Sequence, residues 1–198
     1  MEYPEHEPEV CRGLRLMQHL GFPPRGDELE FPLGEQDRAA GAHLRATHDL
    51  STGEYVCLHP GARDPARRWA PASFAAVGDA LAGRGLRVVL TGSATEVANV
   101  QAVRRAMRQP SVDLSGLTDL GALAALLESA RLVVCNDTGV SHLAAALRVP
   151  SVVVFVASDR RRWAPLDECR HRPVDIRTCD NALRDVLVEV DRLLEAPR

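Results

Sequence analysis

The sequence predicts a doubly wound α/β domain with a mostly parallel sheet, preceded by an N-terminal helical arm. Two observations support this fold class. From Tyr55 onward, strand, turn and helix patterns follow one another in regular alternation. The strand patterns, such as residues 132–135 and 151–155, are almost continuously apolar instead of apolar at alternate positions. Continuous apolar strands indicate burial on both faces, as in a parallel sheet covered by helices.

Residues 1–50 are predicted to form the helical arm, and residues 51–198 the α/β domain. The first helix of the arm repeats apolar residues at helical spacing and ends at a glycine: Val10, Leu14, Met17, Leu20 and then Gly21. A second helix is predicted over residues 35–46. No strand pattern alternates with these helices, which favours an interdomain linker that docks on its own domain or self-associates.

The α/β domain is predicted to contain five strands and five helices in alternation. The strands are residues 55–58, 86–91, 112–114, 132–135 and 151–155. The helices are residues 73–81, capped by Ser73, and residues 95–107, 120–129, 139–147 and 181–194. Sheets of this kind bind ligands in a crevice at the carboxyl ends of their strands. The turns that follow the strands are therefore where functional residues are expected.

Composition excludes several classes of protein. The net charge of −3 does not fit a nucleic-acid-binding protein, and all 24 basic residues are arginine. The five cysteines have no metal-ligand spacing, so we expect no metal site and a reduced, cytoplasmic protein. No apolar stretch approaches the roughly 20 residues needed to span a bilayer, and no signal peptide opens the chain. We expect a soluble protein, or one peripheral to a membrane.

The turn and helix start at residues 136–146, Asn-Asp-Thr-Gly-Val-Ser-His-Leu-Ala-Ala-Ala, give the strongest chemical signal. Unpaired N–H groups at a helix start attract phosphate, and Gly139 would let a ligand approach the backbone closely. The alternative is structural: Asp137 caps the helix and His142 packs beneath it. The residues alone favour the two interpretations equally.

A second signal is the turn His59-Pro60-Gly61-Ala62, which is followed by Arg63, Arg67 and Arg68. Arginines beside a glycine turn suit a diphosphate because guanidinium makes charge-assisted, often bidentate contacts. The alternative is a solvated basic loop, and His59 by itself is interpreted as a packed structural histidine.

A third, weaker signal is the turn from Gly92 to Glu96. The Glu96 carboxylate would accept hydrogen bonds from ribose or sugar hydroxyls, or stabilise the first turn of a helix. Residues 115–118, Ser-Gly-Leu-Thr, are interpreted as a turn that lines the same crevice. The chain contains no Walker loop, no Gly-x-Gly-x-x-Gly after the first strand and no Gly-x-Ser-x-Gly elbow.

Together these motifs resemble the heptosyltransferase family, glycosyltransferase family nine. The resemblance covers residues 55–165 and rests on five motifs in family order: His59–Ala62, Arg67-Arg68-Trp69-Ala70-Pro71, Gly92–Glu96, Ser115–Thr118 and Asp137–Ala145. It implies the second, Rossmann-like domain of a two-domain B-type glycosyltransferase. Arg67 stands where family members carry lysine. The family's proposed catalytic aspartate belongs to a first domain that this chain would lack.

The resemblance implies a role for each site residue. Gly61, Ala62, Asp137, Thr138, Gly139 and His142 would bind the diphosphate and sugar of the donor, and Glu96 would lie near the nucleoside. Arg67 would stabilise the leaving phosphate as the bond to the sugar breaks, with inversion at the anomeric carbon. No metal or other cofactor is implied, because arginine and helix-end amides supply the positive charge.

The resemblance also implies partners. The donor would be ADP-heptose, and a lipid-linked saccharide of the lipopolysaccharide core would be the acceptor, bound through the missing domain. The enzyme would be cytoplasmic, with peripheral contact to the inner membrane, and this chain alone would be inactive for want of a general base. Two alternatives stay open: a binding-only or regulatory sugar-nucleotide domain, and a sugar-nucleotide epimerase-like domain.

Overall fold

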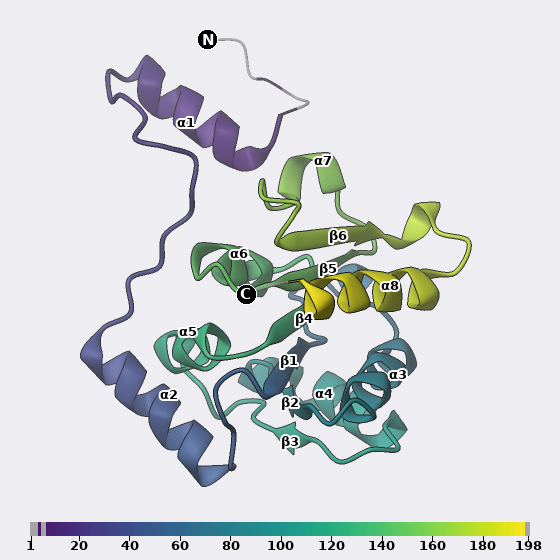
Figure 1. Ribbon diagram of the computed structural model, residues 1–198. Helices are drawn as coiled ribbons and strands as arrows, with labels where there is room; N and C mark the ends of the chain where they lie inside the picture. Colours follow the sequence, from purple (N-terminus) through teal and green to yellow (C-terminus); the bar gives the residue numbers. More distant parts are fainter. Residues whose placement is uncertain (1–3, 5–6, 197–198) are drawn as a thin grey trace.

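The computed structural model of the chain describes residues 4 and 7–196 and contains one six-stranded sheet (Figure 1). Every strand pairing in it is parallel, in the order β3-β2-β1-β4-β5-β6. The strands are β1 Tyr55–His59, β2 Arg87–Leu90, β3 Val112–Asp113, β4 Leu132–Asn136, β5 Ser151–Phe155 and β6 His171–Asp175. The predicted doubly wound, parallel fold is confirmed.

The five predicted strands all form, and β6 is a strand that the sequence pattern did not predict. β1, β4 and β5 are buried along their whole length, which explains their continuous apolar runs. β6 is an edge strand of mixed burial with Pro173 at its centre. Proline and charged residues are tolerated at a sheet edge, so β6 lacks the apolar run by which the other strands were recognised.

Helices cover both faces of the sheet and divide the core in two. One cluster packs side chains of α3 Pro71–Ala82, α4 Val97–Ala106 and α8 Ala182–Glu195 on one face. The other cluster packs α5 Leu120–Glu128 and α6 Gly139–Ala146 on the opposite face. Alternate residues of each central strand join alternate clusters, for example Leu58 and Cys57. α7 Arg160–Trp163 is a short helix between β5 and β6 (Figure 1).

Two predicted helix starts differ from the structure. α3 begins at Pro71 with Ala70 as its N-cap, so Ser73 lies within the first turn and is not the cap. Proline at the first helical position needs no backbone N–H, which makes it a strong start signal. The helix predicted from residue 95 begins as a short 3₁₀ helix, Ala94–Glu96, and continues as α4.

The arm contains the two predicted helices, α1 Glu9–His19 and α2 Glu35–Thr47, joined by an extended segment (Figure 1). α2 packs closely against α5. Gly41 of α2 is buried in this contact, and a Cβ atom there would lie 2.6 Å from that of Ala125. The arm therefore docks on its own domain, as expected, through α2.

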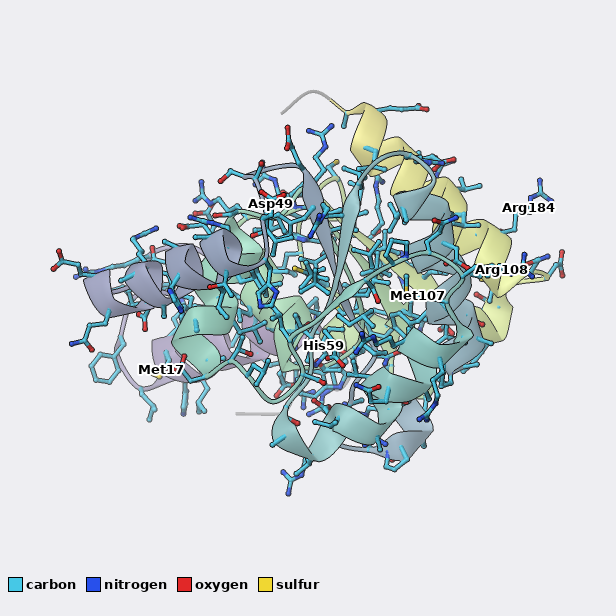
Figure 2. All side chains as sticks on the ribbon, turned by 90° about the horizontal axis from the view of Figure 1, so that it is seen from below. Met17, Asp49, His59, Met107, Arg108 and Arg184 are labelled. Carbon is cyan, nitrogen blue, oxygen red and sulfur yellow. The ribbon has the colours of Figure 1, made fainter. Side chains whose placement is uncertain are left out.

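An ion pair joins α1 to the rest of the domain. Glu9 pairs with Arg162 of α7 at 2.7 Å and with Arg12 at 3.0 Å. The second half of the apolar stripe lies in solvent: Met17 is 44% exposed and Leu20, just after α1, is 59% exposed, and Met17 lies at the periphery of the molecule (Figure 2). Of the apolar stripe, Val10 and Leu14 are half-buried and Met17 and Leu20 are exposed, so self-association through the exposed end stays a prediction. In the part of the chain that the structure describes, no helix is long and apolar enough to cross a membrane.

The packing of α2 on α5 predicts opposite effects for two glycine substitutions in the arm. Gly41→Ala places a methyl group inside the α2–α5 contact, and we expect the free energy of unfolding to fall by about 1–3 kcal/mol, as for overpacked cores. Gly13→Ala in α1 is the matched control. Its Cβ would meet nothing within 4 Å, so it should be neutral or stabilise by up to about 1 kcal/mol. Thermal unfolding of both variants checks this, and an unaffected Gly41→Ala protein would contradict the packing.

Candidate functional site

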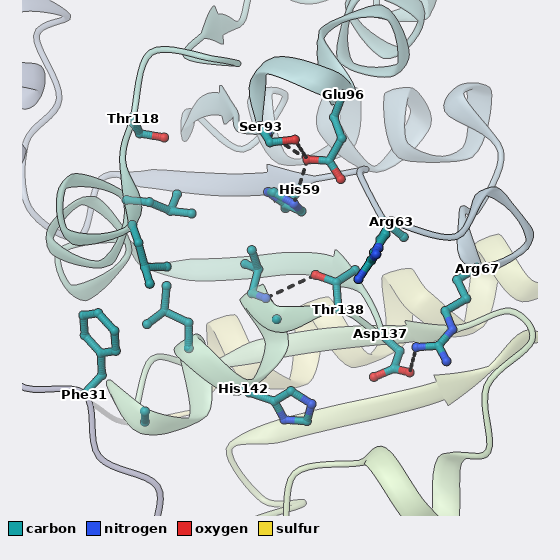
Figure 3. A pocket seen from close by; sticks show the side chains of 18 of the residues that line it. Phe31, His59, Arg63, Arg67, Ser93, Glu96, Thr118, Asp137, Thr138 and His142 are labelled. Atoms are coloured by element: carbon teal, nitrogen blue, oxygen red, sulfur yellow. Dashed lines mark hydrogen bonds and ion pairs between the residues drawn. The ribbon is translucent and has the colours of Figure 1, made fainter.

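A cleft of 1150 Å³ opens at the carboxyl ends of the central strands (Figure 3). The chain leaves β1 toward α3 on one face and leaves β4 toward α6 on the other, so the cleft lies where the direction of winding reverses. Seven of the eight predicted site residues line it: Ala62, Arg67, Glu96, Asp137, Thr138, Gly139 and His142. Gly61 is buried behind the lining.

The side chain of Asn136 holds the loop that carries the arginines. This amide is fully buried at the end of β4. It donates to the carbonyl of Pro60 at 2.8 Å and accepts from the backbone N–H of Trp69 at 3.0 Å. Both ends of the loop 60–69 are therefore tied to the strand that precedes Asp137. Asn136 belongs to the motif at residues 136–146, but the sequence pattern does not predict this role.

The helix after β4 is capped by Thr138 and not by Asp137. Thr138 Oγ1 accepts from the N–H of Val140 at 3.1 Å, and Thr138 is the N-cap residue of α6. The alternative interpretation, in which Asp137 caps the helix, is therefore wrong. Gly139 is the first residue of α6, and a Cβ atom there would meet nothing within 4 Å.

Asp137 is a buried carboxylate that faces one cation. Asp137 is 3% exposed, and its Oδ2 atom has no hydrogen-bond partner among residues 4 and 7–196. Arg67 Nη1 lies 3.7 Å from that oxygen, beyond hydrogen-bond distance, and the Arg67 side chain is 39% exposed (Figure 3). A buried polar atom without a partner in a cleft marks a position where a ligand donor fits.

The other two arginines of the loop differ in their contacts. Arg68 Nε donates to the carbonyl of Ala62 at 2.8 Å and so stabilises the turn. Arg63 is exposed, lines the cleft and makes no ion pair with any residue that the structure describes. Figure 3 shows Arg63 and Arg67 on the same side of the cleft. Two guanidinium groups are thus available to an anion here.

Glu96 both stabilises its turn and lines the cleft. It accepts from the backbone N–H and the hydroxyl of Ser93 at 2.7 and 2.8 Å. Burial alone would raise the pKa of Glu96, but these hydrogen bonds, with His59 and Arg68 nearby, hold the pKa below its usual range. A Cβ atom on Gly61 would lie 2.3 Å from this carboxylate, which explains the glycine.

Both histidines of the cleft have a lowered pKa, which favours their neutral forms. Burial lowers the pKa of His59, whose Nδ1 lies 3.0 Å from Thr91 Oγ1, in agreement with a packed structural histidine. Burial also lowers the pKa of His142, against a smaller opposing effect of Asp137. The His142 ring contacts the Trp163 ring at a centroid distance of 6.1 Å.

Part of the cleft lining is apolar. Phe31 from the arm lies opposite the arginines (Figure 3), and Leu120 and Leu123 of α5 also line the cleft. Leu120 is 60% exposed although it lines the cleft, so it offers an apolar surface to a flat ligand group. The sequence pattern does not predict this surface, because Phe31 is distant in sequence from the motifs of the cleft. Among the described residues, no group of three His, Cys, Asp or Glu side chains is arranged to hold a metal ion.

Comparison with protein families finds one model that matches. It is described as glycosyltransferase family 9 (heptosyltransferase), and it matches residues 1–182. The chain is 36% identical over 114 residues to lipopolysaccharide heptosyltransferase 3 of Escherichia coli, covering 56% of this chain and 34% of the relative. It is 34% identical over 158 residues to lipopolysaccharide heptosyltransferase 2 of E. coli K12, covering 77% and 44%. The chain thus spans between a third and a half of the length of these curated relatives.

Solved structures share the fold. A family 9 glycosyltransferase of Veillonella parvula superposes with a TM-score of 0.86 at 19% identity, covering 98% of this chain and 62% of that one. E. coli ADP-heptose lps heptosyltransferase II superposes with a TM-score of 0.74 at 26% identity, covering 86% and 55%. An E. coli heptosyltransferase solved with ADP gives 0.66 at 20% identity, covering 97% and 59%.

The assignment of the helix cap makes a stability prediction. Thr138→Ala removes the acceptor for the Val140 N–H and should lower the free energy of unfolding by about 0.5–2 kcal/mol. Asp137→Ala should cost less, because the lost carboxylate caps nothing and its buried oxygen has no hydrogen bond. Urea unfolding of the two variants compares them directly. A larger loss in Asp137→Ala would restore the capping role to Asp137.

Proposed function

The chain belongs to glycosyltransferase family 9, the heptosyltransferase family, and from this premise we propose that it is the donor-binding half of an inverting glycosyltransferase. The donor would be ADP-heptose, and the acceptor a lipid-linked saccharide of the lipopolysaccharide core. The names of two relatives support this choice, since one is an ADP-heptose transferase and another was solved with ADP.

One observation carries the proposal: an exposed and a half-buried arginine, a buried carboxylate oxygen without a hydrogen bond and a helix start share one cleft. Each suits a different part of a sugar nucleotide. Guanidinium groups and helix-start N–H groups suit the diphosphate. A carboxylate suits sugar hydroxyls, which are hydrogen-bond donors. The apolar part of the lining, with Leu120 and Phe31, suits a base.

In this proposal Arg67 and Arg63 bind the diphosphate, and Arg67 stabilises the charge that develops on the leaving phosphate. Asp137 and His142 hold the sugar, with Thr138 and Gly139 presenting the start of α6. Glu96 accepts from the ribose hydroxyls, held by Ser93 and backed by Gly61. Ala62 borders the phosphate position. No metal is needed to neutralise the diphosphate.

We further propose that the general base comes from outside the described residues. Most carboxylates of the cleft already have a local role: Asp64 and Asp119 cap helices, Glu96 binds Ser93, and Asp137 faces Arg67. Glu30 is exposed on the arm. In the proposal, residues 1–50 are a linker to a domain that supplies the base and the acceptor site, on the cytoplasmic face of the inner membrane.

Donor binding is tested with two glycine substitutions. We expect ADP-heptose at millimolar concentration to give binding heat with residues 1–198 by calorimetry. Gly139→Ala should abolish it while leaving the melting temperature unchanged, because the added methyl group has open space in the free protein and blocks only a ligand close to the backbone. Gly61→Ala should weaken binding and lower stability together, since it displaces Glu96. Undiminished binding in Gly139→Ala would contradict a ligand at the start of α6.

Transfer is the second test. We expect residues 1–198 alone to transfer no heptose to a lipopolysaccharide-core acceptor, because a positioned general base is typically worth about 100- to 10,000-fold. Supplying a protein segment with a carboxylate base should start the reaction. Radiolabelled transfer by residues 1–198 alone would show that the base lies within them.

A further inference from the structure

We propose that the ion pair between Arg67 and Asp137 makes the site discriminate between a nucleotide sugar and the bare nucleoside diphosphate. The diphosphate draws Arg67 away from Asp137, and only a ligand that also carries a sugar hydroxyl gives Asp137 a new partner. The inference rests on the proposed function, because it assumes that the cleft binds a diphosphate.

The two partners are unequal in their freedom to move. Asp137 follows a central strand directly, and its backbone N–H donates to the carbonyl of Val154 at 3.0 Å. Its carboxylate is buried in the wall of the cleft. Arg67 ends a three-residue 3₁₀ helix in the loop, and its side chain is 39% exposed. An anion that enters the cleft therefore moves the arginine and leaves the carboxylate where it is.

No other cation is placed to replace Arg67 at Asp137. Arg68 is tied to the carbonyl of Ala62. Within the described residues, Arg63 makes no ion pair, and Arg67 is the arginine whose ion pair reaches Asp137. Burial keeps His142 neutral at ordinary pH, because it lowers the pKa of that imidazole. Asp137 thus depends on Arg67 for its counter-charge in the free protein.

Separation of the pair is costly for the buried partner. A buried carboxylate whose cation is removed keeps its charge in a poorly solvated position, and this is strongly unfavourable. The Asp137 Oδ2 atom has no hydrogen bond that would reduce this free-energy penalty. A sugar hydroxyl that donates to this oxygen supplies the missing contact, so the nucleotide sugar leaves both groups with partners. The nucleoside diphosphate has no sugar hydroxyl to donate to Asp137. It is therefore bound more weakly and is released after transfer.

A double-mutant cycle on the full chain tests whether the ligand exchanges the partners of Arg67 and Asp137. The affinities for ADP and for ADP-heptose are measured by calorimetry. Asp137→Asn removes the charge that holds Arg67. We expect it to raise the affinity for ADP about 10-fold, within the range of coupling between neighbouring side chains, and to lower the affinity for ADP-heptose. In an Arg67→Gln background the gain for ADP should vanish. In an Arg63→Gln background, the matched control from the same loop, the gain should persist.

Three results would overturn the inference. If Asp137→Asn lowers the affinity for ADP-heptose and leaves that for ADP unchanged, Asp137 contacts the sugar without restraining Arg67. If the gain for ADP is the same with and without Arg67, Asp137 repels the phosphate directly. If the unsubstituted chain binds neither ligand, the proposed function itself fails, and the exchange with it. Asp137→Ser serves as a second variant where the asparagine protein does not fold.

Discussion

The geometry of the cleft depends on the hydrogen bonds of one buried side-chain amide, that of Asn136. It joins the end of β4 to both ends of the loop 60–69, through the carbonyl of Pro60 and the N–H of Trp69. A buried amide that loses these partners has no water to replace them, so the loop and the strand are stable only together. Arg63 and Arg67 are thereby held at the cleft, and Arg67 lies beside the carboxylate of Asp137, the residue that follows β4.

The parallel sheet places this contact at the crevice where a ligand would bind. β1 and β4 are neighbours in the sheet, and helices leave them on opposite faces, so their carboxyl ends form the two walls of one crevice. One wall carries partly exposed positive charge on a loop. The other carries a fixed, buried negative charge beside the start of α6. A ligand with an anionic and a hydroxyl-rich part, such as a nucleotide sugar, is complementary to both walls.

Sequence alone predicted the sheet and most of the cleft, because each buried strand carries an apolar run and each motif follows such a strand. The failures have separate physical causes. β6 lies at the sheet edge and contains Pro173, so its pattern is polar. The cap of α6 belongs to Thr138, and a local motif cannot tell which of two adjacent polar residues turns toward the helix. Phe31 reaches the cleft from the arm, a contact set by tertiary packing alone.

The most direct test of the central claim, that this cleft binds a nucleotide sugar, is an NMR titration of the ¹⁵N-labelled chain with ADP-heptose. The account predicts that the largest amide shifts fall at the start of α6, Thr138 to Val140, in the arginine loop from Ala62 to Arg67, and around Glu96. Those amides surround the positions assigned to the phosphates, the sugar and the ribose. An absence of shifts at saturating ligand, or shifts confined to the distant helix α8, would contradict it.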